Sequence, residues 1–330
     1  MKKFLIIQTA FIGDVILATP IIEKLHRFYP DAQIDFLLRK GNESLLEGHP
    51  NIHQLLIWNK KENKTSNLFR IIKEVKHNKY DYVINLHRHF SSGLITAFSG
   101  SKNKIGFDKN PFSLSYTQKI KHTIGDKQNP KHEAERNLDL ITTITDNKPA
   151  PVKLYPSQYD INHTIIYKHE KYICIAPTSV WFTKQFPVHK WVELIKNTLP
   201  IYKVYLLGSA SDKNACNEII KASERGNIEN LCGKLTLLQS AALMKDAAMN
   251  YVNDSAPLHL ASAMNANVTA IFCSTIPVFG FGPLSDNSKI IETKLNLDCR
   301  PCGLHGFNSC PKGHFLCAES IEVKEMILLR

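Results

Sequence analysis

Short apolar runs alternate, over the first half of the chain, with segments in which apolar residues recur every three or four positions. Apolar runs are typical of buried strands, and the longer spacing is typical of amphipathic helices. The pattern predicts strands at Phe4–Gln8, Gln33–Leu38, Gln54–Trp58, Tyr82–Leu86 and Asn103–Phe107. It predicts helices from Asp14 to about Arg27, over Asn67–His77 and over Pro130–Thr145. Strands that alternate with helices predict a parallel sheet covered on both faces.

The pattern breaks at Asn147–Asp160, where Pro151, Pro156 and scattered polar residues interrupt it, and then starts again. We therefore place a linker there and predict two domains, residues 1–155 and 156–330. In the second domain the predicted strands are Tyr172–Ala176, Lys203–Leu207, Asn250–Val252 and Val268–Phe272. The predicted helices are Val188–Thr198, Asp212–Ala222, Leu237–Ala247 and one that begins at Ser255. In open sheets of this α/β class, ligands bind beyond the carboxyl ends of the strands.

Charge is uneven along the chain. The whole chain has 41 Lys and Arg against 30 Asp and Glu, and most of the excess lies in residues 1–150, so the first domain is the candidate for meeting an anionic partner. Aromatic residues do not interleave with the basic clusters, which disfavours nucleic-acid binding.

The apolar run after Lys3 stops at Gln8, too early for a signal peptide. We therefore expect a cytoplasmic protein with mainly reduced cysteines.

One helix start has the features of an anion site. The segment Asn253–Ala263 follows an apolar run; Asp254 or Ser255 can cap the first turn, and Pro257 fits within it. A helix that starts at the end of a strand presents its positive dipole end there. An ordinary capped helix with a hydrogen-bonded His259 explains the same pattern equally well.

Two further loops carry chemically useful residues. The loop Thr9–Asp14 has a single glycine, Gly13, and lacks the G-x-G-x-x-G of dinucleotide binders. Asp14 is either a helix N-cap or a general base. The loop Ala176–Pro187 offers hydroxyls and a lysine that suit a diphosphate, at Thr178, Ser179 and Lys184. A solvent-facing loop with an incidental lysine is the alternative.

The C-terminal part is rich in cysteine. Cys299 and Cys302 form a C-x-x-C pair, and Cys310 and Cys317 follow with a wider gap. The spacing matches a zinc or iron–sulfur site only in part. Reduced or conditionally bridged thiols are favoured over a structural metal, and a catalytic metal has less support.

Taken in order, these motifs resemble glycosyltransferase family 9, the bacterial heptosyltransferases of lipopolysaccharide core assembly. The resemblance covers nearly the whole chain and rests on the Gly13-Asp14 turn, Lys184-x-Phe186-Pro187, the segment from Asp254 to Ala261, and the cysteine-bearing tail. The tail from Leu295 to Cys302 looks especially like heptosyltransferase II. Ser255-Ala256 stands where the family usually has Thr-Gly, and Phe186 where it often has Trp.

The resemblance implies a GT-B fold, with two Rossmann-like domains facing each other across a cleft. The first domain would bind the acceptor and the second the ADP-heptose donor, and the last helix, Ala318–Arg330, would pack back on the first domain. Asp14 matches the proposed base of an inverting transfer, and Lys184 would stabilise the departing ADP without an obligatory metal. The other implied donor-binding residues are Thr178, Ser179, Gly233, Leu235, Asp254, Ser255, Ala256 and His259.

The implied acceptor is a lipid-anchored glycan with acidic sugars and phosphates, met at the inner-membrane surface. His87, Arg88 and His89 directly follow a predicted strand and are the first candidates to bind it, together with Gly13 and Arg136. Further basic candidates in the first half are Arg39, Lys40, Lys102, Lys104 and His132. Two alternatives remain open: a transferase of the same fold that uses another donor, such as a UDP-hexosamine, and a nonenzymatic nucleotide-binding protein.

Overall fold

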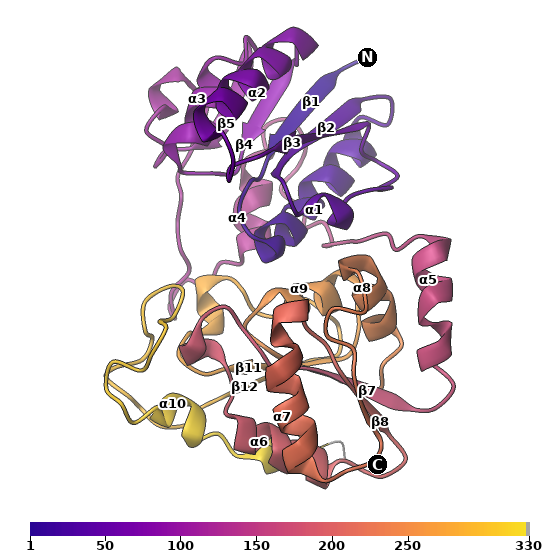
Figure 1. Ribbon diagram of the computed structural model, residues 1–330. Helices are drawn as coiled ribbons and strands as arrows, with labels where there is room; N and C mark the ends of the chain where they lie inside the picture. The colour runs from indigo at the N-terminus through magenta and orange to yellow at the C-terminus, as the bar shows by residue number, and fades with distance from the viewer. Residues whose placement is uncertain (328–330) are drawn as a thin grey trace. The chain divides into compact units, whose positions relative to one another are not determined.

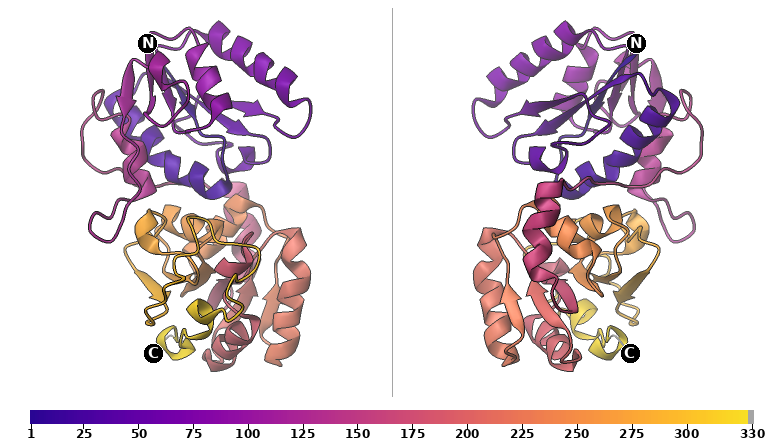
Figure 2. Two further views of the ribbon diagram at one scale, coloured as in Figure 1. Left: turned by 90° about the vertical axis from the view of Figure 1, so that its left-hand side faces the viewer. Right: turned by 90° about the vertical axis from the view of Figure 1, so that its right-hand side faces the viewer.

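The chain forms two α/β domains. The computed structural model describes residues 1–327 and divides into the units Met1–Tyr155 and Pro156–Arg330 (Figures 1 and 2). Each unit is built on a parallel six-stranded sheet. The predicted α/β class, with two parallel sheets covered by helices, is confirmed.

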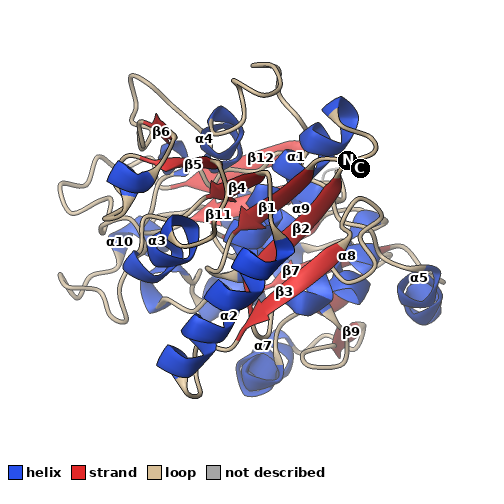
Figure 3. Cartoon of the chain, turned by 90° about the horizontal axis from the view of Figure 1, so that it is seen from above, coloured by secondary structure: helices blue, strands red, loops and turns tan. Residues whose placement is uncertain are grey.

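The first sheet has the strand order β3-β2-β1-β4-β5-β6. Its strands are β1 (Lys3–Ile7), β2 (Gln33–Arg39), β3 (Gln54–Trp58), β4 (Tyr82–Asn85), β5 (Asn103–Phe107) and β6 (Gln118–Ile120). Its helices are α1 (Ile12–Phe28), α2 (Lys64–Asn78), α3 (Phe90–Ala97) and α4 (Glu133–Asp139). Because the strand order reverses at β1, right-handed crossovers place α1 on one face and the neighbouring helices α2 and α3 on the other (Figure 3).

Successive side chains of each strand point to opposite faces of the sheet, so the core of this domain forms two layers. Leu5 and Ile7 of β1 join Trp58 of β3 in a buried cluster that also contains Ile71 of α2 and Ile95 of α3. The intervening residues of β1 point to the opposite face of the sheet, as the two-residue period of a strand requires. A strand buried on both faces therefore reads as a continuous apolar run, as β1 does.

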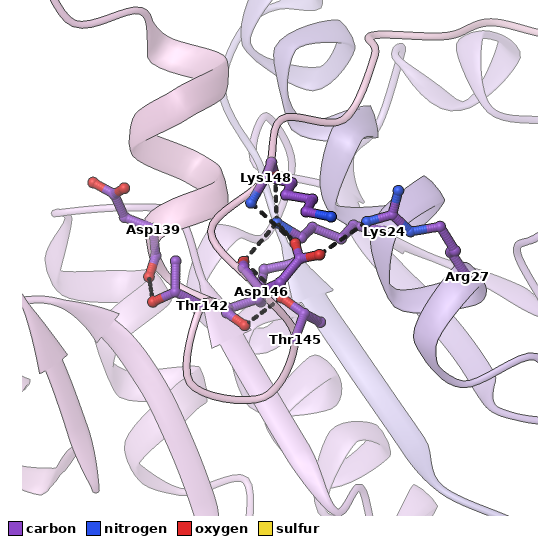
Figure 4. Close-up of polar contacts among 8 residues, drawn as sticks. Lys24, Arg27, Asp139, Thr142, Thr145, Asp146 and Lys148 are labelled. Atoms are coloured by element: carbon purple, nitrogen blue, oxygen red, sulfur yellow. Dashed lines mark hydrogen bonds and ion pairs between the residues drawn. The ribbon is translucent and has the colours of Figure 1, made fainter.

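A buried lysine fastens α1 to the segment that ends the first domain. Lys24 Nζ donates 2.6 Å hydrogen bonds to the carbonyls of Asp146 and Lys148 and lies 2.7 Å from the Asp146 carboxylate (Figure 4). The Lys24 side chain is fully buried, so its ammonium group has no contact with water. The three oxygen partners compensate for the lost hydration. The contacts hold the end of the domain at a fixed place on α1.

The second sheet has the strand order β12-β11-β10-β7-β8-β9. Its strands are β7 (Tyr172–Ala176), β8 (Lys203–Leu206), β9 (Ile228–Asn230), β10 (Asn250–Asn253), β11 (Val268–Phe272) and β12 (Ser288–Glu292). Its helices are α5 (Gln158–Thr164), α6 (Val188–Asn197), α7 (Lys213–Ser223), α8 (Leu237–Lys245), α9 (Ala256–Ala263) and α10 (Leu316–Glu319). Helix α6 packs beside α7, and α8 packs beside both α5 and α9.

The tail of the chain corrects one prediction. Ala318, Ile321, Val323 and Met326 are buried in the second domain's own core, and Tyr251 of β10 donates a 2.8 Å hydrogen bond to the Met326 carbonyl. The prediction of a last helix that packs on the first domain is therefore wrong for residues 318–327, because these apolar side chains already complete the α6 and α7 side of the second sheet. Residues 328–330 lie outside the described part.

Other differences are local. The predicted helix Pro130–Thr145 is confined to α4, because after Asp139 the chain continues in turns in which Ile141 N–H donates to the Leu138 carbonyl. The edge strands β6, β9 and β12 were not predicted. Strands β6 and β9 have three residues each, and all three strands are largely solvent-accessible, so they lack the apolar run of a central strand.

Candidate active site

In the first domain, the candidate residues lie at the carboxyl ends of the strands. Asp14 is not the N-cap of α1, as the sequence suggested, but its third residue, because the helix begins at Ile12. Its carboxylate accepts a 3.2 Å hydrogen bond from the N–H of Phe11. Gly13 precedes it in the first helical turn.

The pKa of the Asp14 carboxyl group lies in the range that suits a general base. Burial and, secondarily, the negative charge of Glu133 raise its pKa to about 6, against a smaller opposing effect of the backbone hydrogen bonds and Arg39. A base that titrates near neutrality is ionised in the cell and still accepts a proton readily. Glu133 belongs to the first turn of α4, which packs against α1, and was missed because its link to Asp14 is tertiary.

His87 supports the loop that carries Asp14 and does not act as a cation. Its ring is buried, and Nε2 accepts a 2.8 Å hydrogen bond from the N–H of Thr9. Burial, reinforced by the nearby charge of Lys60, lowers the pKa of His87 to about 3. A neutral imidazole is needed to accept that hydrogen bond, so His87 offers no positive charge here, and its contact with the acceptor stays a prediction.

Lys60 is a cation at this edge that the sequence did not single out. It follows β3 and donates hydrogen bonds of 2.8 and 2.9 Å to the carbonyl and hydroxyl of Thr9. Burial, followed by repulsion from Arg39 and Lys64, lowers its pKa to about 8. The only sequence signal was its place just after a strand, which it shares with many surface lysines.

The remaining acceptor candidates differ in exposure. Arg88 and His89 are exposed at the end of β4, where they are available to a ligand. Arg136 is buried, with its guanidinium 2.5 Å from the Glu133 carboxylate and 2.6 Å from the Lys131 carbonyl. Arg136 is therefore committed to holding Glu133, so the predicted direct contact with an acceptor is not supported.

In the second domain, Lys184 and Asp254 form an ion pair. Lys184 Nζ lies 2.6 Å from Asp254 Oδ2, and the hydroxyl of Thr275 donates a 2.6 Å hydrogen bond to the same oxygen. Lys184 ends a 3₁₀ turn, Phe182–Lys184, and Asp254 lies between β10 and α9. The ion pair thus brings together the loop after β7 and the start of α9, although the two residues are 70 positions apart in the sequence.

Helix α9 begins as the sequence indicated. Ser255 is its N-cap residue, Ala256 its first residue, and Pro257 lies in the first turn. The helix macrodipole places partial positive charge at this end, beside the Lys184 ammonium. His259 is buried one turn further on, with its ring 6.3 Å from that of Phe281.

Thr178 and Ser179 are half-buried in the loop after β7. Gln185 Nε2 donates a 2.7 Å hydrogen bond to the Ser179 carbonyl, and Asn253 Nδ2 donates one of 2.8 Å to the Pro177 carbonyl. The loop is therefore tied to the Lys184 turn and to the end of β10. This leaves the Thr178 and Ser179 side chains at the same edge of the sheet as the ion pair.

Gly233 and Leu235 follow β9 at that edge. Gly233 has φ +75°, and a Cβ atom there would lie 2.8 Å from the Ala210 backbone. Only glycine fits without a shift, so the close approach of the two loops requires it. Leu235 is half-buried two residues later.

The cysteine-bearing tail braces the Lys184 turn. Thr183 donates its N–H to the Phe307 carbonyl at 3.1 Å, and its hydroxyl accepts from the Phe307 N–H at 2.8 Å. Arg300 donates to the carbonyls of Cys273 and Thr275 at 2.8 and 2.7 Å. Sequence reasoning missed Thr183, Thr275 and Arg300, because their role depends on contacts between distant segments.

The four tail cysteines are free thiols that share one cavity of about 360 Å³ with His314. Cys299 Sγ lies 3.9 Å from His314 Nε2. Within residues 1–327, no group of three or more His, Cys, Asp or Glu side chains is arranged to hold a metal ion.

Comparison with known proteins places this architecture in a family. The model of glycosyltransferase family 9 (heptosyltransferase) matches residues 68–305. Lipopolysaccharide heptosyltransferase 3 of Escherichia coli strain K12 is 30% identical over 297 residues, which span 83% of each chain. Other relatives carry the names heptosyltransferase 1 and 2, so the predicted likeness to one type does not distinguish among them.

Solved structures show the same fold. A family 9 glycosyltransferase from Veillonella parvula superposes with a TM-score of 0.85 at 20% identity, over 98% of this chain and 94% of that one. ADP-heptose lipopolysaccharide heptosyltransferase II of E. coli gives a TM-score of 0.75 at 22% identity, over 92% and 96%. The predicted GT-B class, with two Rossmann-like α/β domains, is confirmed. From its sequence and its architecture together, this chain belongs to glycosyltransferase family 9 and is a glycosyltransferase.

Proposed function

We propose that the protein transfers a heptose from ADP-heptose to the inner core of lipopolysaccharide, with inversion at the anomeric carbon. Family membership supports the reaction class, and the names of the relatives support the sugar and the acceptor. The observation that carries the proposal is the Lys184–Asp254 ion pair at the start of α9. It supplies a fixed cation and a helix dipole where a diphosphate leaving group needs them.

The donor binds to the second domain. The hydroxyls of Thr178 and Ser179 donate hydrogen bonds to the phosphate oxygens. Ser255 and Ala256, at the start of α9, contact the same diphosphate. The loop at Gly233 and Leu235 binds the adenine. Asp254 holds the Lys184 ammonium, and His259, one turn into α9, binds the donor together with the helix start. Charge that develops on the β-phosphate as the glycosidic bond breaks is stabilised by Lys184 and the helix end, so the reaction needs no obligatory metal ion.

The acceptor binds to the first domain. Asp14 removes the proton from the acceptor hydroxyl as that oxygen attacks the anomeric carbon from the side opposite ADP. Its pKa of about 6 keeps it ionised at neutral pH. Arg88, joined by Lys60 and Arg39, supplies the positive charge that binds the phosphates and acidic sugars of a lipid-anchored glycan. Burial, followed by the charges of Lys60 and Arg88, lowers the pKa of His89, so His89 offers a neutral imidazole for hydrogen bonds to the acceptor.

The protein works in the cytoplasm at the surface of the inner membrane, where its lipid-anchored acceptor is presented. No helix within residues 1–327 is long and apolar enough to cross a membrane. We propose a peripheral contact with the bilayer, because the acceptor is lipid-anchored.

The test is a donor comparison with purified protein and a deep-truncated lipopolysaccharide acceptor. Release of nucleoside diphosphate is followed with ADP-heptose, UDP-glucose and UDP-N-acetylglucosamine. We expect turnover with ADP-heptose and its loss in Asp14→Asn. NMR of the product should show an anomeric configuration opposite to that of the donor. Preference for a UDP-sugar would reject the donor assignment, and unchanged turnover in Asp14→Asn would reject the base.

A further inference from the structure

Helix α3 of the first domain carries apolar side chains on its exposed side as well as in the core. Its residues read FSSGLITA and include no charged side chain. Ser92 and Thr96 are buried, whereas Phe90 is 61% exposed and Phe98, the C-cap residue, is 59% exposed. A solvent-facing helix normally has polar residues on its outer face.

The exposed apolar residues fall on one side of α3. Phe90, Leu94 and Phe98 are spaced four positions apart, which places them along one face of a helix. Leu94 lies half-buried between the two exposed aromatic rings. The outer face of the helix is therefore a continuous apolar strip.

A neighbouring turn extends the strip. The Phe112 ring packs edge-on against Phe90 at a centroid distance of 5.0 Å, and Gly93 makes the approach possible, since a Cβ there would lie 2.9 Å from the Phe112 ring. Leu114, two residues later, is 90% exposed. We call Phe90, Leu94, Phe98, Phe112 and Leu114 the α3 patch.

Basic residues lie on the segments that flank the α3 patch. Arg88 precedes α3, Lys102 follows it, and Lys109 belongs to the loop that Asn110 ties to the carbonyls of His87 and His89. Helix α2 packs beside α3 (Figure 1), and its Lys76 side chain lies against Gly100, two residues after Phe98. The lysines and the arginine are exposed. Between Leu86 and Ile120 the sequence has a single acidic residue, Asp108.

We propose that the α3 patch docks the enzyme on an anionic lipid bilayer. Stable peripheral binding to a membrane requires two contributions. Exposed apolar side chains enter the acyl boundary, and neighbouring cations bind the anionic headgroups. A neutral protein partner would not use the basic rim. The inference rests on the proposed function for its purpose: the patch adjoins Arg88 and His89, so docking brings that segment to a lipid-anchored acceptor.

The test separates docking from catalysis by using vesicles that contain no acceptor. Full-length protein is sedimented with vesicles of phosphatidylethanolamine and phosphatidylglycerol (7:3) and, separately, of pure phosphatidylcholine. We expect binding to the anionic vesicles that falls at least tenfold with phosphatidylcholine, in 0.5 M NaCl, and in the double variant Phe98→Ser/Leu114→Ser. Lys102→Glu/Lys109→Glu should weaken binding as well.

Ile201→Ser is the matched control, because Ile201 is 57% exposed in the second domain and its loss should leave vesicle binding unchanged. Thermal melts of each variant establish that it folds. Absence of binding to anionic vesicles, or equal binding by the α3 double variant, overturns the proposal whatever the enzyme's activity. A dimer in solution that Phe98→Ser/Leu114→Ser dissociates, without vesicle binding, would assign the patch to a second copy instead.

Activity supplies an independent reading. Phe98→Ser/Leu114→Ser should lower kcat/KM at least tenfold for acceptor embedded in anionic vesicles and leave it unchanged for a soluble, deacylated acceptor. If no variant or wild-type protein transfers heptose to either acceptor, the proposed function fails while the vesicle measurement still decides the docking surface.

Discussion

Lys184 Nζ lies 2.6 Å from Asp254 Oδ2, and both side chains are largely buried. The pair joins the loop after β7 to the start of α9, and Thr275 fixes the carboxylate from the end of β11. A lysine held in this way keeps its charge in place before the substrate arrives. Such preorganised charge stabilises a transition state without reorganisation during the reaction.

Replacement of Lys184 should therefore affect chemistry more than donor binding. For Lys184→Met we expect kcat to fall about 10²–10³-fold, the magnitude found when a preorganised electrostatic group is removed, with a smaller rise in KM for the donor. Lys184→Arg should recover little, because a planar guanidinium does not reproduce a point charge at the same place. Steady-state kinetics measures both; an unchanged kcat in Lys184→Met would show that the leaving group is stabilised elsewhere.

The acidity of Asp14 sets the acid limb of the pH–rate profile. The base is active when ionised, so kcat/KM should fall tenfold per pH unit below about 6, the pKa to which burial and Glu133 raise this group. Glu133→Gln removes the second of those causes and should move the limb to lower pH. Ser157→Ala, in α5's N-cap, serves as a control whose limb stays in place.

Asp14 should also lower the stability of the fold near neutral pH. Its folded pKa lies above the ordinary value of 3.8, so the folded state disfavours the ionised form. The cost is absent below about pH 4 and complete above about pH 6. Asp14→Asn should thus be more stable than wild type at pH 7.5, by up to about 3 kcal/mol for a pKa raised from 3.8 to about 6, and the difference should vanish near pH 4. Thermal or urea unfolding at both pH values checks the sign.

His87 gives the opposite dependence on acid. Its folded pKa of about 3 lies below the ordinary value of 6.5, so below pH 6.5 the unfolded chain takes up a proton that the folded chain does not. Stability should decline progressively as pH falls from 6.5 toward 3. His87→Gln keeps an acceptor for the Thr9 N–H but does not titrate, so its unfolding free energy should depend less on pH over this range. An equal dependence in the variant would assign the acid sensitivity to other groups.

Chelation should leave the transfer reaction intact. Because Lys184 and the α9 end supply the positive charge at the leaving group, we expect turnover to persist after dialysis against EDTA and without added Mg²⁺. A loss of activity that Mg²⁺ or Mn²⁺ restores would contradict this. Elemental analysis of the same sample reports whether the thiols at Cys299, Cys302, Cys310 and Cys317 carry a metal in solution.

Much of the fold followed from local patterns. Central strands such as β1 and β10 are buried on both faces and therefore stand out as apolar runs, and Pro257 together with Ser255 marked the start of α9. Edge strands did not stand out, since exposure removes the apolar signal. The packing of Ala318 and Met326 into the second domain was misjudged because an apolar tail does not itself specify which surface it covers.

The sequence by itself determined the α/β class, the break in the pattern between the domains, and the positions of Asp14, Lys184 and Asp254 on segments that follow strands. Those features depend on periodicity, turn residues and motif spacing, which are local. Only the tertiary structure decided that His87 is a buried acceptor, that Arg136 is held by Glu133, that Lys60 reaches Thr9, and that α3 turns its aromatic side outward. A side chain's charge state and direction depend on neighbours brought together by folding, and those neighbours lie far away along the chain.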